Sequence, residues 1–245
     1  MYDYTDLLKS EEVVFSQTKN ELKGIYENFP KLINVCFYMQ QSIGKFEDIH
    51  TPHGELQSIA YMHICQLSYT LKVIYELQMK GYYFESNLLI RNVFESLVQL
   101  NYFNKHPENI KNHFKKKINM KAMIEEITGE KEKLYDKYSI LSKLTHGFII
   151  KDICRTDRES NRTYLGNTYN EYLVTISINW IPPLVKGFIN IFDTIFPNNL
   201  LSENIKAKGL KIEMLEWCNE FEKTHIEANP EAKEFYKAIR DVIEK

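Results

Sequence analysis

The stretch YFESNLLIRNVFESLVQLNYFNK, residues 83–105, decides the fold of this chain. Apolar residues fall on almost every side of a helix drawn through it, which is typical of a helix that is buried on most of its surface. Within this apolar run, Arg91 and Glu95 are four positions apart and therefore share one helical face. We predict a central apolar helix, preceded by Gly81 as the C-cap of one helix and followed by Pro107 in the first turn of another.

Helical patterns cover most of the rest of the chain. The expected further helices span residues 3–27, 30–44, 55–80, 107–127, 130–147, 168–195, 201–226 and 230–244. Breakers separate some of them, because Pro52 and Gly54 belong to an expected loop over 44–54 and Pro182-Pro183 must interrupt 168–195. Residues 151–167 are expected to form a long polar connection.

Strand-type alternation is nearly absent from the sequence, and Gly and Pro are scarce at 9 and 7 residues. Both features favour long helices over many short strands. The sequence therefore predicts an all-α multi-helix bundle with a central apolar helix. We expect a single helical domain over 1–245, with a core bundle at about 30–195 and appended C-terminal helices at 201–245 packed on it.

Composition excludes several classes of protein. A net charge of −2 gives no overall attraction to nucleic acid or to an anionic membrane. No apolar run approaches the length of a membrane span, and the N-terminus is too polar for a secretory signal, so we expect a cytoplasmic protein. The cysteines are too far apart to indicate disulfides or a zinc knuckle, and lie at Cys36, Cys65, Cys154 and Cys218.

Arginine is rare here, with five residues among 31 Lys plus Arg. The abundance of Lys, Asn, Ile and Tyr is typical of an AT-rich bacterial coding sequence, so each Arg is more informative than usual. Three of them, Arg155, Arg158 and Arg162, fall in one segment and alternate with acidic residues. This segment is either a solvated loop or a loop that contacts phosphate, since Arg suits phosphate oxygens.

Arg91 and Glu95 allow two interpretations. A guanidinium among apolar neighbours must be paired, and Glu95 is the nearest partner, so the two residues form an internal ion pair in the first interpretation. In the second, Arg91 binds an anion or acts in catalysis within a cleft. The choice of Arg over Lys indicates a planar group with several donors, which suits both interpretations.

His146 ends a predicted helix on which Ser142 and Lys143 lie on roughly the same side. A histidine at this position either caps the helix or belongs to a site. Two Glu-x-x-His pairs, Glu47/His50 and Glu222/His225, are close to the number expected by chance, so we predict no metal site. The chain has no Gly-rich phosphate loop, Gly-x-Ser-x-Gly elbow or kinase signature, so we predict no cofactor.

The segments GYYFESNLLIRNVFESLVQLNYFNKHPENI (81–110) and YSILSKLTHG (138–147) resemble a family of uncharacterised bacterial helical proteins. That family has an Arg-x-x-x-Glu helix with an aromatic tail, followed by a second helix that closes on Ser-x-x-x-His. Its pattern is matched by Arg91, Glu95, Ser142 and His146. The resemblance covers about 70 of the 245 residues.

More distantly, the arrangement looks like the HEPN superfamily, whose members are helical bundles, often dimers, and in many cases metal-independent ribonucleases of toxin–antitoxin and antiphage systems. Their motif places an Arg four to six residues before a His on one helix. The corresponding positions here hold Ser139, Ile140 and Leu141. Chemistry of that type would therefore need Arg91 from a neighbouring helix to act with His146.

Two functions follow. The resemblance implies a HEPN-like defence or toxin-type effector that acts on RNA or a nucleotide, in which His146 is the general acid/base and Arg91 stabilises phosphoryl charge. The broken motif and near-neutral charge favour a non-catalytic interaction or sensor subunit, in which Arg91 and Glu95 are structural. In either case we expect a homodimer, or a protein partner from the same operon. The balance leans slightly to the effector.

Overall fold

The computed structural model describes residues 3–111, 118–128, 156–157, 162–163 and 169–228. Within these ranges the chain is an all-α bundle, as the sequence predicts, together with one short β pair. The helices are α1 (Tyr4–Glu21), α2 (Lys23–Gln41), α3 (Pro52–Met79), α4 (Tyr83–Lys105), α6 (Met120–Thr128), α9 (Glu171–Ile178), α10 (Ile181–Ile195) and α11 (Ile205–Ala228). Single 3-10 turns lie at Pro107–Asn109 and Leu200–Ser202, and β1 (Thr156–Asp157) pairs antiparallel with β2 (Arg162–Thr163).

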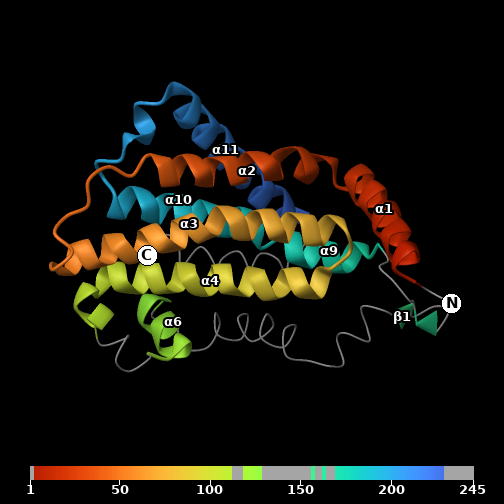
Figure 1. Ribbon diagram of the computed structural model, residues 1–245, viewed down its shortest axis with the longest axis horizontal. Helices are drawn as coiled ribbons and strands as arrows, with labels where there is room; N and C mark the ends of the chain where they lie inside the picture. Colours follow the sequence, from red (N-terminus) through yellow and green to blue (C-terminus); the bar gives the residue numbers. More distant parts are fainter. Residues whose placement is uncertain (1–2, 112–117, 129–155, 158–161, 164–168, 229–245) are drawn as a thin grey trace.

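The long helices are arranged around α3, α4 and α10. α2, α3 and α4 lie side by side, and α10 packs against all three (Figure 1). α11 covers α2 and α10, α6 and α9 pack on α4, and α1 leans against α2 and α3. The predicted central apolar helix is thus α4, which contacts α3, α6, α9 and α10. No helix in the described ranges is long and apolar enough to cross a membrane.

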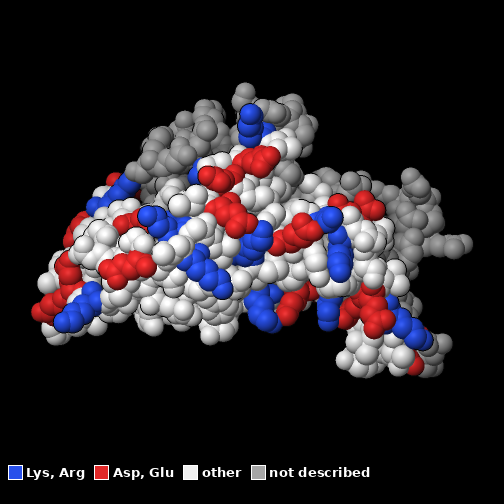
Figure 2. Space-filling model, turned by 90° about the horizontal axis from the view of Figure 1, so that it is seen from above, with Lys and Arg blue, Asp and Glu red and all other residues white. Residues whose placement is uncertain are grey.

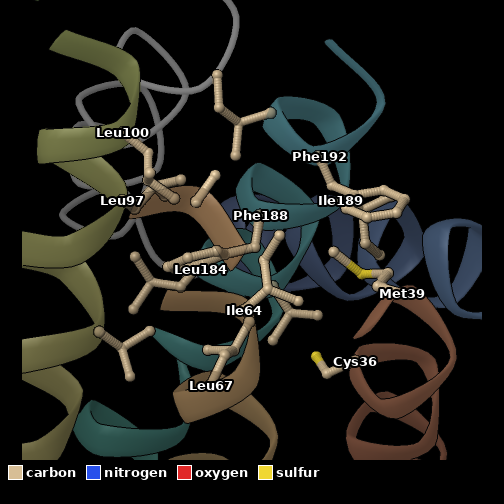
Figure 3. Close-up of a cluster of buried hydrophobic side chains, with 14 of the residues drawn as sticks. Cys36, Met39, Ile64, Leu67, Leu97, Leu100, Leu184, Phe188, Ile189 and Phe192 are labelled. Atoms are coloured by element: carbon tan, nitrogen blue, oxygen red, sulfur yellow. The ribbon is translucent and has the colours of Figure 1, made fainter. Parts of the chain in front are cut away.

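The core is continuous across these helices. Figure 3 shows side chains from α2, α3, α4 and α10 pointing into one cluster. The labelled members are Cys36, Met39, Ile64, Leu67, Leu97, Leu100, Leu184, Phe188, Ile189 and Phe192. Burying one such apolar side chain contributes about 1.5–3 kcal/mol, so the four helices are held together as one unit.

A left-handed glycine turns the chain from α3 into α4. Gly81 has a φ of 84°, its N–H donates to the Gln78 carbonyl at 3.1 Å, and the Tyr82 N–H donates to the Leu77 carbonyl at 2.8 Å. These two bonds make a Schellman motif. The predicted C-cap at Gly81 is confirmed, and the predicted helix over 83–105 has the bounds of α4.

The variant Gly81→Ala is expected to lower the free energy of unfolding by about 1–2 kcal/mol, because a side chain in the left-handed region is strained. Urea denaturation measures this change. The matched control is Gly24→Ala, since Gly24 is helical and a Cβ there meets nothing within 4 Å. The control should be neutral or stabilising. Equal losses in the two variants would contradict a special role for the backbone at Gly81.

The predicted helix over 3–27 is wrong at its C-terminal end. α1 ends at Glu21, the chain turns at Leu22, and α2 begins at Lys23 and continues through Pro30. A proline inside a helix removes one backbone hydrogen bond. Its neighbours Phe29 and Leu32 are fully or almost fully buried. We infer that packing of α2 on the core outweighs the local cost of Pro30.

The interpretation of Pro52 and Gly54 as breakers is also wrong, because both lie in the first turn of α3. Thr51 is the N-cap, and its side chain accepts from the Gly54 N–H at 3.0 Å. Proline is favoured at the first helical position, where its missing N–H has no partner to lose. Glycine is required at 54, since a Cβ there would lie 2.1 Å from the Asp48 carbonyl oxygen.

The predicted continuous helix over 107–127 is wrong as well, because residues 118–119 are not helical and α6 begins after them. The predicted break at Pro182-Pro183 is confirmed, since α9 ends at Ile178 and α10 begins at Ile181. The predicted helices over 130–147 and 230–244 lie outside the described residues.

α1 is tied to the α3–α4 turn through a buried carboxylate. Glu11 is 9% exposed, accepts a hydrogen bond from the Tyr82 hydroxyl at 2.7 Å, and lies 3.0 Å from the Lys80 ammonium. The bond from Tyr82, reinforced by Lys80, holds the pKa of the Glu11 carboxyl below its ordinary value of 4.5. The ionised form of Glu11 therefore stabilises the docking of α1.

Replacing Glu11 by Gln is expected to lower the free energy of unfolding by about 1 kcal/mol at pH 7. A folded-state pKa below the unfolded value stabilises the fold above about pH 4.5, and this contribution is lost as the pH falls through the lowered pKa. The difference between wild type and Glu11→Gln should therefore shrink in acid. Denaturant unfolding at several pH values tests this, with the exposed Glu12→Gln as the control. A difference that does not depend on pH would contradict the assignment.

Candidate functional site

Arg91 and Glu95 form an ion pair on α4. The Arg91 Nε donates to the Glu95 Oε1 at 2.8 Å, as the spacing of four residues predicts. Their side chains are 20% and 26% exposed. The pair is fixed on a rigid element, because the adjacent residues Ile90 and Phe94 are fully buried. Arg91 is thus held in place at the margin of the bundle, neither sealed in the core nor fully hydrated.

Five of the other predicted site residues fall outside the part of the chain that the structure describes. They are Ser142, Lys143, His146, Arg155 and Arg158. Convergence of Arg91 with His146 therefore stays a prediction.

The segment that carries Arg162 contains the β pair, which the sequence reasoning missed by treating 151–167 as a connection without strands. Arg162 lies in β2 and is paired across the antiparallel bridge with Asp157 of β1. A two-residue strand leaves no alternation to detect, so no sequence signal was available. The bridge brings one arginine backbone next to an acidic residue, which is compatible with both interpretations of this segment.

The structure also brings together polar residues that the sequence reasoning did not combine. A groove of about 130 Å³ runs between α3 and α4 over α10. Its polar residues are His63, Gln66 and Thr70 from α3 and Asn92 and Ser96 from α4. A signal existed, because the spacings within each helix place each set on one face. The sequence does not show that the face of α3 and the face of α4 lie beside each other in the fold.

The described acidic and histidine residues form no cluster of three or more His, Cys, Asp or Glu side chains that could hold a metal. Glu47 approaches His53 at 3.6 Å rather than forming a unit with His50. Glu222 is engaged with the Lys186 ammonium at 3.3 Å. The side chain of His225 lies outside the described residues, and the described Glu47 and His50 belong to no such cluster.

Surface charge is mixed in sign where it is visible. On the face drawn in Figure 2, Lys and Arg alternate with Asp and Glu, and neither sign gathers into a patch. The structure also contains exposed ion pairs, such as Lys31 with Glu213 at 2.6 Å. A broad electrostatic footprint for nucleic acid is therefore not found on this face, and any phosphate contact there must be local.

No protein-family model, curated protein or solved structure matches this chain.

A double-mutant cycle with Arg91→Met and Glu95→Gln measures the strength of the Arg91–Glu95 pair. We expect a coupling free energy of about 1 kcal/mol, because the pair is shielded from solvent on most sides. The matched control is Lys72–Glu76, an i,i+4 pair on α3 at 2.6 Å with both side chains more than half exposed. That pair should couple by only about 0.3–0.5 kcal/mol. Equal coupling in the two cycles, measured by urea unfolding, would show that Arg91 gains nothing from its position.

Proposed function

We propose that this protein is a HEPN-like effector that acts on RNA or a nucleotide, with Arg91, Glu95 and His146 as its catalytic residues. The observation that carries the proposal is the position of Arg91. It is fixed by Glu95 at 2.8 Å on the central helix and still reaches the surface. A preorganised guanidinium of this kind stabilises charge on a phosphoryl group without the cost of being ordered during the reaction.

Each residue has one role in this mechanism. Glu95 orients the guanidinium of Arg91, which stabilises the charge that develops on the phosphoryl oxygens. His146 takes the proton of the attacking 2′-hydroxyl or gives one to the leaving oxygen. The binding residues named by the sequence are Ser142, Lys143, Arg155, Arg158 and Arg162. The biological setting that fits such an effector is a cytoplasmic, homodimeric toxin or antiphage protein of a bacterium.

A second candidate is a non-catalytic helical interaction or sensor subunit that dimerises, with Arg91–Glu95 as a structural ion pair. The observation that favours it is the outer face of α3. Residues 56–71 contain no Asp, Glu, Lys or Arg, and Met62 and Tyr69 are 55% and 59% exposed on that face. Met and Tyr are enriched, and charges depleted, at protein interfaces.

Expression toxicity separates the two candidates. Wild-type protein is expected to slow bacterial growth and to cleave RNA without added metal, whereas Arg91→Ala and His146→Ala should lose at least about 100-fold in cleavage, the usual contribution of a general acid/base. All variants are compared at matched folded yield. The controls are Lys72→Ala, which removes an exposed cation, and His50→Ala, which removes an exposed histidine.

The outcomes are distinct. Loss of toxicity and of cleavage in both site variants, with both controls active, supports the effector. Unchanged activity in His146→Ala would sink the proposed chemistry. A folded, dimeric and non-toxic wild type, together with a strong stability loss in Arg91→Ala, supports the interaction subunit.

A further inference from the structure

The groove between α3 and α4 collects five polar side chains from two helices. His63, Gln66 and Thr70 line one wall, and Asn92 and Ser96 line the other. Within the described part of the chain, none of these side chains has a hydrogen-bond or ion-pair partner. The groove thus gathers several donors and acceptors that do not satisfy one another, and Gln66 and Asn92 among them are exposed and within reach of a ligand.

The floor of the groove is apolar. Leu67 of α3, Val93 of α4 and Phe188 of α10 close it from below, and all three are buried. Figure 3 shows Leu67 and Phe188 as members of the same cluster of buried side chains. An apolar floor under a polar rim suits a ring that buries its face and directs its polar edge to the walls.

The size of the groove limits the ligand. About 130 Å³ exceeds the 10–15 Å³, approximately, that one water requires, yet falls below the roughly 300–1,000 Å³ of a drug-sized site. The groove therefore holds a few waters or one small ring. A polymer or a large cofactor could place only one of its parts here.

The walls carry no charge. No Asp, Glu, Lys or Arg lines the groove. Burial lowers the pKa of the His63 imidazole below its ordinary value of 6.5, so this ring is neutral at pH 7. We therefore expect an uncharged ligand group, since no charged side chain lines the groove to pair with an ion.

We propose that this groove binds a neutral nucleobase. Asn92 and Gln66 each present a carbonyl and an amino group side by side, and such amides pair with the donor and acceptor edge of a base. The hydroxyls of Thr70 and Ser96 and the ring of His63 supply further single bonds. Unstacked bases are recognised in proteins in this way, by edge hydrogen bonds and an apolar or aromatic contact to the ring.

The groove lies next to the ion pair on α4. Asn92 and Ser96 each follow a member of the pair, Arg91 and Glu95, by one residue, which is a rotation of about 100° around the helix. The choice of a nucleobase among small neutral heterocycles rests on the proposed function, in which the protein acts on RNA or a nucleotide. The groove would then read the base while Arg91 acts on the phosphate.

Binding of adenosine, guanosine, cytidine and uridine to the full chain tests the proposal by isothermal titration calorimetry. We expect saturable binding of at least one nucleoside, in the millimolar range typical of a ligand of this size. Asn92→Leu should weaken it by about tenfold or more, since a bidentate amide contact is lost. The control Asn219→Leu changes an exposed asparagine of α11 that does not line the groove, and should bind like wild type.

Thr70→Val, a nearly isosteric change, is the second variant in case Asn92→Leu fails to fold. Absence of saturable binding by wild type, or wild-type affinity in both groove variants, would overturn the proposal. Binding of a short single-stranded RNA made of the preferred base distinguishes two possible ligands, a base within RNA and a free nucleoside. Tighter binding than the nucleoside assigns the groove to a base within RNA, and equal binding assigns it to a free nucleoside.

The groove and the catalytic proposal fail separately. Arg91→Ala should keep nucleoside binding, because nucleosides carry no phosphate, while it abolishes toxicity. Toxicity without nucleoside binding refutes the groove and leaves the effector. Nucleoside binding without toxicity or RNA cleavage refutes the effector and leaves a base-binding subunit.

Discussion

The packing of α3 against α4 over α10 is the contact on which both candidate sites depend. Gly81 reverses the chain between the two helices, and buried side chains from both then lock their rotation about their own axes. Because a helix is rigid, fixing its inner face also fixes its outer residues. The polar walls of the groove and the Arg91–Glu95 pair are therefore placed by the core beneath them.

This contact also explains an unusual distribution of charge. Residues 56–71 of α3 are uncharged, and between residues 86 and 104 of α4 the charged residues are Arg91 and Glu95. An uncharged stretch of this length on the exposed side of α3 is unexpected for a freely hydrated surface, where Lys and Glu are easily accommodated. A face that keeps neutral polar groups together with exposed Met and Tyr is adapted to contact something less polar than water.

Structural features that depend only on residues close together in the sequence were predicted correctly in three places. The bounds of α4, the left-handed Gly81 and the break before Pro182 follow from residues within one turn of each feature. Pro30 and Pro52 were misread because proline is not always a terminator. At Pro52 the N-cap Thr51 makes it a helix start, and at Pro30 the packing of α2 on the core tolerates it.

The candidate site was likewise predictable only in part. The pair on α4 could be predicted because i and i+4 share a face within one helix. The groove could not, since its walls come from two helices whose relative rotation is set by core packing. The β pair at Arg162 was invisible for a similar reason, because two residues define a bridge only through their partner strand. Contacts between residues of one helix, such as Arg91 with Glu95, can thus be predicted from the sequence, whereas contacts between helices cannot.

The surroundings of α4 bear on why residue 91 is an arginine. One face of the helix enters the core, a second lines the groove through Asn92 and Ser96, and a third carries Arg91 and Glu95. Lysine is the common cation of this chain, and a lysine at 91 would also pair with Glu95. Arginine adds a planar group with several donors, one of which, Nε, bonds to Glu95. That geometry serves a partly buried ion pair as well as a contact to phosphate, so the choice of arginine agrees with both interpretations of the pair.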